Sequence, residues 1–261
     1  MPFLDTPEVR LHYEVHGEGL PVTVCGHGVG SSIGETRLFT AGVEGTLVFL
    51  HFRGHGESGV PDDGWGYAAM SRDLRAVADH TEATQVLGIS LGAGAALRVL
   101  AETPDRFARC VFLIPAVLDQ LRETGSRDGL LELADLLDRG DVEAIADHHV
   151  NGLPEDFREL PGIRGLMRER ALVQLKSGVR QALRGLATEP AIAERAALAR
   201  VTAPSLVIGQ EGDEQHPAQV ARELAAALPN ARLHVFDAKW ALLRERELTR
   251  GLITDVLNRA G

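Results

Sequence analysis

A glycine-flanked serine between an apolar strand and a helix restricts the fold of this chain more than any other feature. The motif is Gly88-x-Ser90-x-Gly92, and it stands between the apolar run 84–87 and a helical pattern at 93–102. So sharp a strand-to-helix turn strains the serine backbone, and side chains two residues to either side would collide. We therefore expect Ser90 at the carboxyl edge of a sheet. The alternative is a buried serine with only a structural role.

Short apolar runs alternate with helical patterns along most of the 261 residues. Runs of this kind are typical of buried strands, and the segments between them have helical spacing. The predicted strands are Val9–Val15, Val22–Cys25, Leu47–His51, Gln85–Ile89, Arg109–Ile114, Ser205–Ile208 and Arg232–Phe236. The predicted helices are Tyr67–His80, Ala93–Glu102, Ala218–Ala227 and Leu248–Arg259. This alternation predicts an α/β fold with a mostly parallel sheet of about eight strands and helices on both faces.

Residues 119–198 interrupt the alternation, because they contain helical patterns and no candidate strand. Leu130, Leu133 and Leu137 share one helical face, and a second apolar stripe runs from 172 to 186. We interpret most of these leucines as ordinary core residues.

Four motifs, in their order and spacing, make the chain similar to the α/β-hydrolase superfamily over nearly its whole length. They are the strand and His-Gly turn at 22–30, the strand and Arg-Gly-x-Gly-x-Ser turn at 47–58, the serine turn at 86–94, and the strand and acidic loop at 204–213. The resemblance implies an α/β-hydrolase core made of residues 1–118 and 199–261. Residues 119–198 would be a helical cap, inserted after the sixth strand, that forms one wall of the pocket.

The resemblance also implies chemical roles around the serine. Ser90 would be the nucleophile, and the backbone N–H groups of Val29 and Leu91 would form an oxyanion hole, in which each donor contributes ~3 kcal/mol of transition-state stabilisation. Asp213 would orient a histidine base, because a serine hydroxyl needs an adjacent base and that base needs a partner. The alternative for Asp213 is a solvated loop carboxylate.

The chain departs from the family at the position of that base. In the family, a catalytic histidine follows the last strand, commonly five residues before a glutamate. Counting back from Glu245 gives Trp240, and no histidine lies beyond His234. His51 also stands where the family usually has an aspartate.

His216 is the leading candidate for a relocated base. It lies three residues after Asp213, in a loop at the carboxyl edge of the sheet, where ligands bind in such folds. The alternative is a surface or capping histidine, since Pro217 follows it.

Three other histidines and Trp240 also bear on the expected pocket. His51 is the second candidate for the base, and a structural replacement of the family's aspartate is its other interpretation. His27 and His55 belong to turn motifs and are interpreted as structural, although we also place His27 in the pocket. Trp240 is expected in the pocket, where its indole would fill space and offer a stacking face.

Composition and charge disfavour several other classes of protein. Lys and Arg total 27 against 37 acidic residues, and this net charge of −10 argues against nucleic acid or an anionic membrane as a partner. The first residues contain neither a basic region nor an apolar run, and no segment approaches the ~18 apolar residues of a membrane helix. We expect a cytoplasmic protein with a small-molecule substrate, and leave the oligomeric state open.

No metal or cofactor is expected. Adjacent His148 and His149 would point about 100° apart on a helix, and we interpret them as part of a solvated face. The glycines at 26, 28 and 30 are not followed by the further glycine and acidic residue of a dinucleotide loop.

Two function classes remain open. The first is a hydrolase of a small ester, lactone or thioester that acts through Ser90 without a cofactor. The second is a member of the fold that has lost hydrolysis, either a small-molecule-binding protein or a lyase or isomerase that uses the oxyanion hole. The serine turn and Asp213 favour the first class, and Trp240 favours the second.

Overall fold

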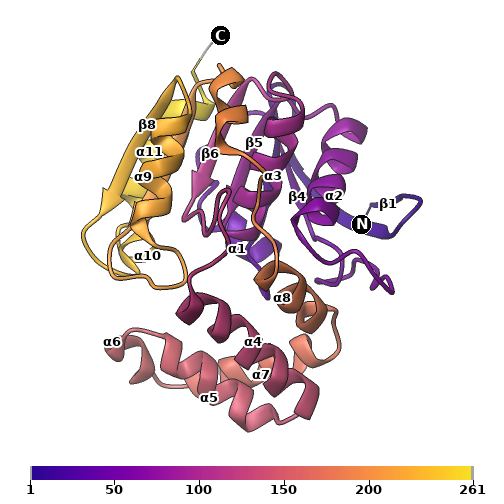
Figure 1. Cartoon of the computed structure of the whole chain (residues 1–261), viewed down its shortest axis with the longest axis vertical. Coiled ribbons are helices and arrows are strands. Elements are labelled where there is room, and N and C mark those ends of the chain that lie inside the picture. The colour runs from indigo at the N-terminus through magenta and orange to yellow at the C-terminus, as the bar shows by residue number, and fades with distance from the viewer. Residues whose placement is uncertain (1, 260–261) are drawn as a thin grey trace.

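An eight-stranded sheet forms the centre of the structure, a computed structural model that describes residues 2–259 (Figure 1). The strands are β1 (Phe3–Asp5), β2 (Arg10–Gly17), β3 (Val22–Gly26), β4 (Thr46–Leu50), β5 (Gln85–Ile89), β6 (Arg109–Leu113), β7 (Ser205–Gln210) and β8 (Ala231–Phe236). Their order is β1-β2-β4-β3-β5-β6-β7-β8. Strands β3 to β8 are parallel, whereas β2 pairs antiparallel with both β1 and β4. The predicted α/β fold with a mostly parallel sheet is confirmed.

Helices cover both faces of the sheet, because its central strands are apolar on both sides. Every residue of β3 and β5 is buried, as expected for parallel strands packed between two layers. One face carries α2 (Tyr67–His80), α3 (Leu91–Glu102) and α9 (Ala218–Ala227), and the other carries α1 (Ile33–Arg37), α10 (Ala241–Arg244) and α11 (Arg246–Leu257). Among the described residues, no helix has the length and apolar character that a membrane crossing requires.

The chain between β6 and β7 is helical and contains no strand. It consists of α4 (Thr124–Arg139), α5 (Val142–Gly152), α6 (Glu155–Arg158), α7 (Ile163–Leu175), α8 (Val179–Ala187) and the 3₁₀ helix η1 (Arg195–Arg200). Figure 1 shows α4 to α7 as a separate layer beyond one end of the sheet. Leu130, Ile145 and Leu183 belong to an apolar cluster of this layer's own. We call residues 119–198 the helical layer; its division from the core at 118/119 and 198/199 stays a prediction.

The structure also contains short elements that the sequence patterns did not indicate. β1 has three residues, α1 five and α10 four, and none is long enough to show a period of its own. Helix α3 begins directly after Ser90, two residues earlier than predicted. Helix α1 matters for function because it carries Glu35, which lines a cavity beside Ser90.

Candidate active site

The turn between β5 and α3 holds Ser90 in a strained backbone conformation. Its φ of 50° and ψ of −102° lie outside the regions that side-chain-bearing residues prefer. Glycine is needed on both sides, since a methyl group at Gly92 would lie 2.2 Å from the carbonyl oxygen of Gly26, and one at Gly88 would lie 2.4 Å from that of Gly92. The strand–turn–helix predicted here is confirmed, and Ser90 lines a cavity at the carboxyl edge of the sheet.

Ser90, His216 and Asp213 form a continuous chain of hydrogen bonds. Nε2 of His216 lies 2.9 Å from Oγ of Ser90, and Nδ1 of the same ring lies 3.0 Å from Oδ2 of Asp213. A carboxylate can only accept, so Nδ1–H donates to Asp213 and Nε2 is left to accept the hydroxyl proton of Ser90. The structure thus brings together the serine, the acid and the leading candidate base that the sequence singled out.

Asp213 is held as a carboxylate by several donors. Oδ2 accepts from Nε2 of Gln210 at 2.8 Å as well as from His216, and Oδ1 accepts the backbone N–H groups of Gln215 at 3.1 Å and of His216 at 3.3 Å. Burial by itself would raise the pKa of Asp213, but the hydrogen bond and charge of His216 outweigh it and bring that pKa well below its usual range. The charged acid therefore fixes both the tautomer and the orientation of the imidazole.

Two backbone N–H groups near Ser90 have no hydrogen-bond partner among the described residues. One belongs to Leu91 in the first turn of α3, where a helix has no acceptor for its own N–H groups. The other belongs to Val29 in the loop after β3; on either side of it, the N–H groups of Gly28 and Gly30 donate to side chains at 2.7 and 3.0 Å. These are the donors predicted for an oxyanion hole, and that role stays a prediction.

His27 lies beneath this loop and not in the cavity, which corrects our placement of it in the pocket. Its side chain is fully buried and is absent from the cavity wall. Nδ1 donates to the carbonyl of Gly28 at 2.7 Å, and Nε2 accepts the backbone N–H of Phe52 at 3.3 Å. Burial, together with the neighbouring histidines, lowers the pKa of His27, so the ring is a neutral support for the loop.

His51 and His55 also lie outside the cavity wall. Nδ1 of His51 is 2.9 Å from Nδ1 of His12, with the two rings stacked. Nε2 of His55 accepts the N–H of Gly30 and so contributes to the shape of the loop. Neither ring is placed to receive a proton from Ser90.

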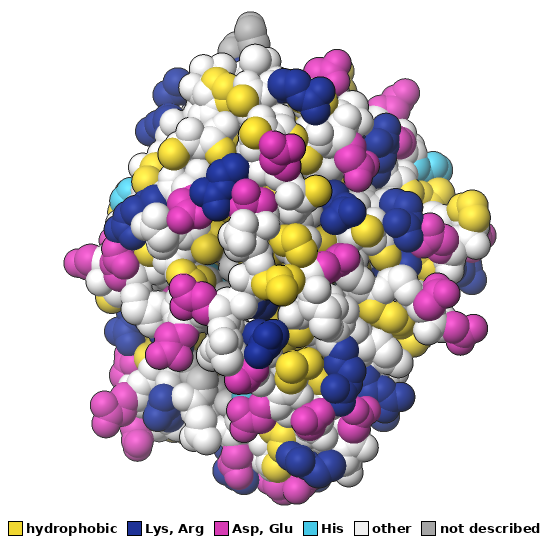
Figure 2. Space-filling model, viewed as in Figure 1, with side chains coloured by type: hydrophobic (Ala, Val, Ile, Leu, Met, Phe, Trp, Pro, Cys, Tyr) yellow, Lys and Arg dark blue, Asp and Glu magenta, His cyan; other side chains and the backbone are white. Residues whose placement is uncertain are grey.

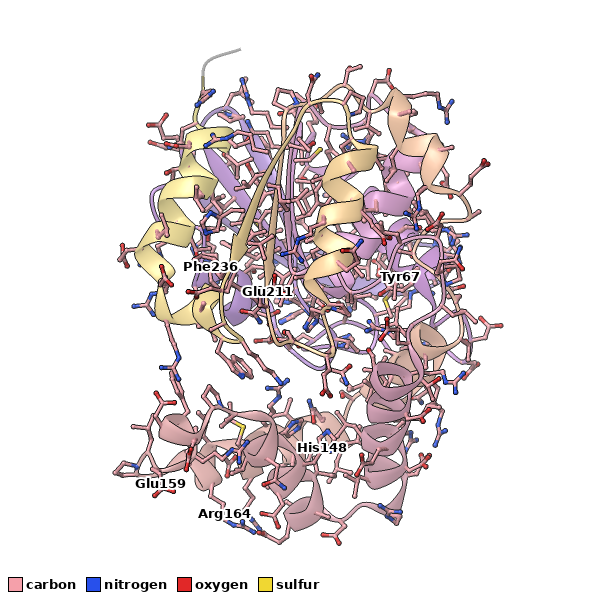
Figure 3. The ribbon with its side chains drawn as sticks, turned by 60° about the vertical axis from the view of Figure 1, so that its left-hand side comes forward. Tyr67, His148, Glu159, Arg164, Glu211 and Phe236 are labelled. Atoms are coloured by element: carbon pink, nitrogen blue, oxygen red, sulfur yellow. The ribbon has the colours of Figure 1, made fainter. Side chains whose placement is uncertain are left out.

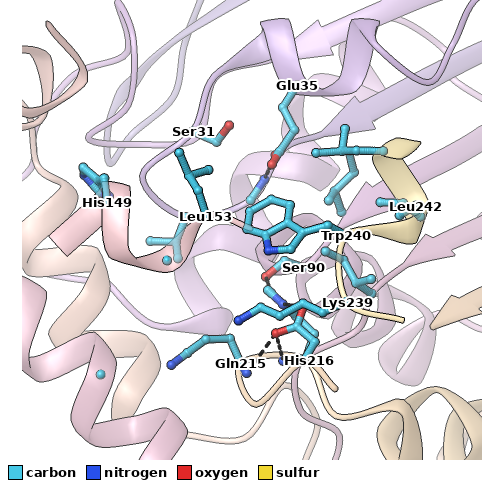
Figure 4. Close-up of a pocket in the computed structure, with 18 of the residues that line it drawn as sticks. Ser31, Glu35, Ser90, His149, Leu153, Gln215, His216, Lys239, Trp240 and Leu242 are labelled. Atoms are coloured by element: carbon cyan, nitrogen blue, oxygen red, sulfur yellow. Dashed lines mark hydrogen bonds and ion pairs between the residues drawn. The ribbon is translucent and has the colours of Figure 1, made fainter. Parts of the chain in front are cut away.

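The cavity beside Ser90 has a volume of about 590 Å³ and lies between the sheet edge and the helical layer. Apolar residues of the layer, among them Leu130, Leu153 and Met167, form one wall. Trp240, which has a φ of 70° and directly precedes α10, forms part of the opposite wall. Figure 4 shows its indole beside Ser90.

Several polar cavity residues were not predicted, among them Glu35, His148, His149 and Arg170. The two histidines, interpreted from sequence as solvated, face the cavity, and Figure 3 shows His148 on the side of the helical layer nearer the sheet. Nε2 of His149 is hydrogen-bonded to Gln174 at 2.7 Å. Only the packing of the layer against the core could place these residues, because a helical pattern does not say which neighbour a polar side chain meets. No group of metal-ligating side chains occurs among the described residues.

Glu35 reaches the loop after β3 from α1. Its Oε2 accepts the N–H of Gly28 at 2.7 Å. A methyl group at Gly28 would lie 3.2 Å from that oxygen and 3.6 Å from Cβ of Ser90, so only the bare glycine backbone separates Glu35 from Ser90. Burial raises the pKa of Glu35, although the Gly28 hydrogen bond and the charge of Arg170 act in the other direction.

Comparison with known proteins agrees with this architecture. Residues 46–239 match the family model of the alpha/beta hydrolase fold. The chain belongs to this family. Among solved structures, an enol-lactonase from Burkholderia xenovorans superposes with a TM-score of 0.84 at 20% identity, covering 99% of this chain and 100% of the other. A hydrolase from Pseudomonas aeruginosa superposes with a TM-score of 0.81 at 22% identity, covering 99% of this chain and 98% of the other. A thermophilic esterase from Thermogutta terrifontis superposes with a TM-score of 0.77 at 22% identity, covering 97% of this chain and 95% of the other.

One curated relative matches a smaller part of the chain. It is the dihydrolipoyllysine-residue acetyltransferase component of an acetoin cleaving system from Cupriavidus necator, 27% identical over 134 residues. The match spans 49% of this chain and 36% of that protein. At these identities the structural likenesses establish the fold and leave the substrate open.

Proposed function

We propose that this α/β-hydrolase is a serine hydrolase that cleaves a small ester, lactone or thioester without a cofactor. The observation that carries the proposal is the hydrogen-bonded chain from Ser90 Oγ through His216 to Asp213, with heavy-atom distances of 2.9 and 3.0 Å. Distances of this length lie within the range from which a base can take the serine proton directly. The similarity in fold to an enol-lactonase and an esterase supports this reaction class.

The geometry supports a two-step acyl transfer. Nε2 of His216 takes the hydroxyl proton while Ser90 Oγ bonds to the substrate carbonyl carbon, and the carbonyl oxygen becomes an oxyanion that the N–H groups of Val29 and Leu91 stabilise. The bond from carbon to the leaving oxygen or sulfur then breaks, and His216 returns its proton to the leaving group. Water attacks the acyl-serine with His216 again as the base, which releases the acid and restores Ser90.

In this proposal His216 replaces the base that the family carries after its last strand. It occupies that role because the loop after β7 holds acid and base only three residues apart, with Gln215 and His216 both donating backbone N–H groups to Asp213. Trp240 then has a different task, since its indole closes one wall of the cavity beside Ser90. A large aromatic wall favours the exclusion of water from the reacting centre.

The non-hydrolytic alternative has less support. A protein that only binds a ligand does not need a strained serine backbone or a serine hydrogen-bonded to a histidine–aspartate pair, and strain of this kind is retained mainly at functional sites.

The first test is covalent labelling. A fluorophosphonate probe should attach to Ser90 of the intact protein, because the probe reacts with serines activated by a neighbouring base. Mass spectrometry of the digested protein should find the added mass on the peptide that contains Ser90. The Ser90→Ala variant is the control. A wild-type protein that stays unlabelled, while its fold is intact by circular dichroism, would contradict the proposal.

Glu35 should limit hydrolysis above its own pKa, where its side chain is charged. An ionised carboxylate several ångströms from the developing oxyanion opposes its formation by ~2 kcal/mol at most in a partly buried site. Burial raises the pKa of Glu35, so the side chain is neutral below that pKa and charged above it. Glu35→Gln keeps an acceptor for the Gly28 N–H and removes the charge. We expect kcat/KM of the variant relative to wild type to rise several-fold as pH increases through the pKa of Glu35.

The measurement is a pH profile of kcat/KM with a neutral 4-nitrophenyl ester. The ratio of variant to wild type at each pH reports the effect of the charge at position 35. Glu44→Gln removes a carboxylate from an exposed position away from the cavity. Its ratio of kcat/KM to that of wild type should not change with pH. A flat ratio for Glu35→Gln as well would show that its charge does not reach the oxyanion.

A further inference from the structure

Three cationic side chains line the cavity beside Ser90: Arg122, Arg170 of α7 and Lys239. None of them has a carboxylate oxygen within 4 Å among the described residues, whereas arginines on the outside, such as Arg164 and Arg184, form ion pairs. We propose that the substrate carries a carboxylate in addition to the ester, lactone or thioester bond that Ser90 attacks. This inference rests on the proposed function and names its substrate class.

Arg170 contacts the loop that carries Val29. Its Nη2 donates to the carbonyl oxygen of Gly30 at 3.1 Å, one residue after Val29, and its guanidinium has no other hydrogen bond to a described residue. The remaining N–H groups are therefore free to donate to a ligand. Two parallel N–H donors of a guanidinium match the two oxygens of a carboxylate, so the side chain suits this group better than a neutral one.

Arg122 provides an independent sign that a negative charge is missing. Its side chain is 7% exposed, and its hydrogen bonds go to neutral groups: Nη1 donates to Oγ of Ser126 and to the carbonyl of Gln215, both at 3.2 Å. Its Nε is buried without an acceptor. A buried cation without a counter-charge is costly, and an anion in the cavity would reduce this cost.

The acidic residues of the cavity form no ion pair within 4 Å with these three cations, although the charges of Glu35 and Arg170 influence each other. Among the described residues that line it, only Glu35 and Asp213 are acidic. Asp213 is occupied by His216 and Gln210, and Glu35 accepts from Gly28. Figure 2 shows acidic and basic side chains interspersed over the face in view, and the chain as a whole has a net charge of −10. An excess of cations inside a concave site of such a protein attracts anions to that site.

The experiment compares two esters of equal length. In mono-4-nitrophenyl adipate the acyl chain ends in a carboxylate, and in 4-nitrophenyl hexanoate a methyl group replaces it. We expect kcat/KM of the wild-type protein to be at least ten-fold higher for the adipate. Arg170→Gln should lower this ratio of adipate to hexanoate about ten-fold, Arg170→Lys should keep an intermediate ratio because it keeps the charge, and Lys239→Gln should lower the ratio less.

Arg164→Gln is the matched control, since it removes a guanidinium from the same helix. Arg164 pairs with Asp147 at the surface, and Figure 3 shows it at the outer edge of the helical layer. This variant should leave the ratio unchanged. A wild-type ratio of one or less, or a ratio that none of the cavity variants alters, would overturn the inference while leaving the proposed hydrolysis intact.

A binding measurement separates the two proposals. Calorimetry with the Ser90→Ala variant should detect adipate and should not detect its uncharged diamide, adipamide, at the same concentration. If neither ester is hydrolysed but adipate binds, the proposed function fails and the carboxylate site stands. Equal binding of adipate and adipamide, or of neither, would refute the carboxylate site.

Discussion

Replacing His216 with alanine is expected to lower kcat for a neutral ester by about 10⁴–10⁶-fold, as loss of the base does in other serine hydrolases. Without the imidazole, no group within hydrogen-bond distance of Ser90 Oγ can take its proton, because Nε2 of His216 is the side-chain partner of that oxygen. The fold should survive, since His216 lies in a loop and its side chain is 20% exposed. The measurement is steady-state hydrolysis of 4-nitrophenyl butyrate, together with thermal unfolding of each variant.

Added imidazole provides the sharper readout. A small base that diffuses into the space left by His216→Ala should restore part of the activity, whereas Ser90→Ala should not respond. His80→Ala removes an exposed imidazole at the end of α2, outside the cavity, and should retain wild-type activity. If His216→Ala keeps more than about a tenth of wild-type kcat, another group serves as the base and the relocated triad is wrong.

The buried ion pair between Arg53 and Asp73 should have the largest effect on stability. Both side chains are almost completely buried. Nε and Nη2 of Arg53 donate to the two carboxylate oxygens of Asp73 at 2.9 and 2.6 Å, and the backbone N–H of Arg53 donates to Asp73 at 3.1 Å. Asp73→Asn leaves the guanidinium without its bidentate acceptor, and we expect the free energy of unfolding to fall by about 3–5 kcal/mol in urea denaturation.

Asp79→Asn is the control on the same helix. Asp79 is about half exposed and pairs with Arg106 at 2.8 Å, and loss of such a surface pair costs ~1 kcal/mol or less. The double variant Arg53→Met with Asp73→Leu replaces the buried pair by two apolar residues. It should recover much of the lost free energy of unfolding, because no uncompensated charge then remains inside the protein. An Asp73→Asn variant as stable as Asp79→Asn would show that the pair does not anchor the turn after β4.

Features that depend on neighbouring residues could be predicted from the sequence. The alternation of apolar runs and helical patterns was enough to predict the sheet and the helices on its faces, because each period reports local burial. The strained turn at Ser90 followed from glycines two residues away on either side. Asp213 and His216 are three residues apart in one loop, so their meeting could also be predicted from local spacing.

The contacts between distant segments could not be predicted in this way, because they depend on how the whole chain packs. Ser90 and His216 are 126 residues apart in the sequence. They come together because β5, β6 and β7 are parallel neighbours in the sheet, so that the loops after β5 and β7 lie at the same edge. Glu35 and Arg170 line the cavity because α1 and the helical layer pack beside Ser90. His27 is instead buried beneath its loop. A sequence pattern indicates which side chains are buried but not which neighbour buries them, so these contacts follow from the three-dimensional packing alone.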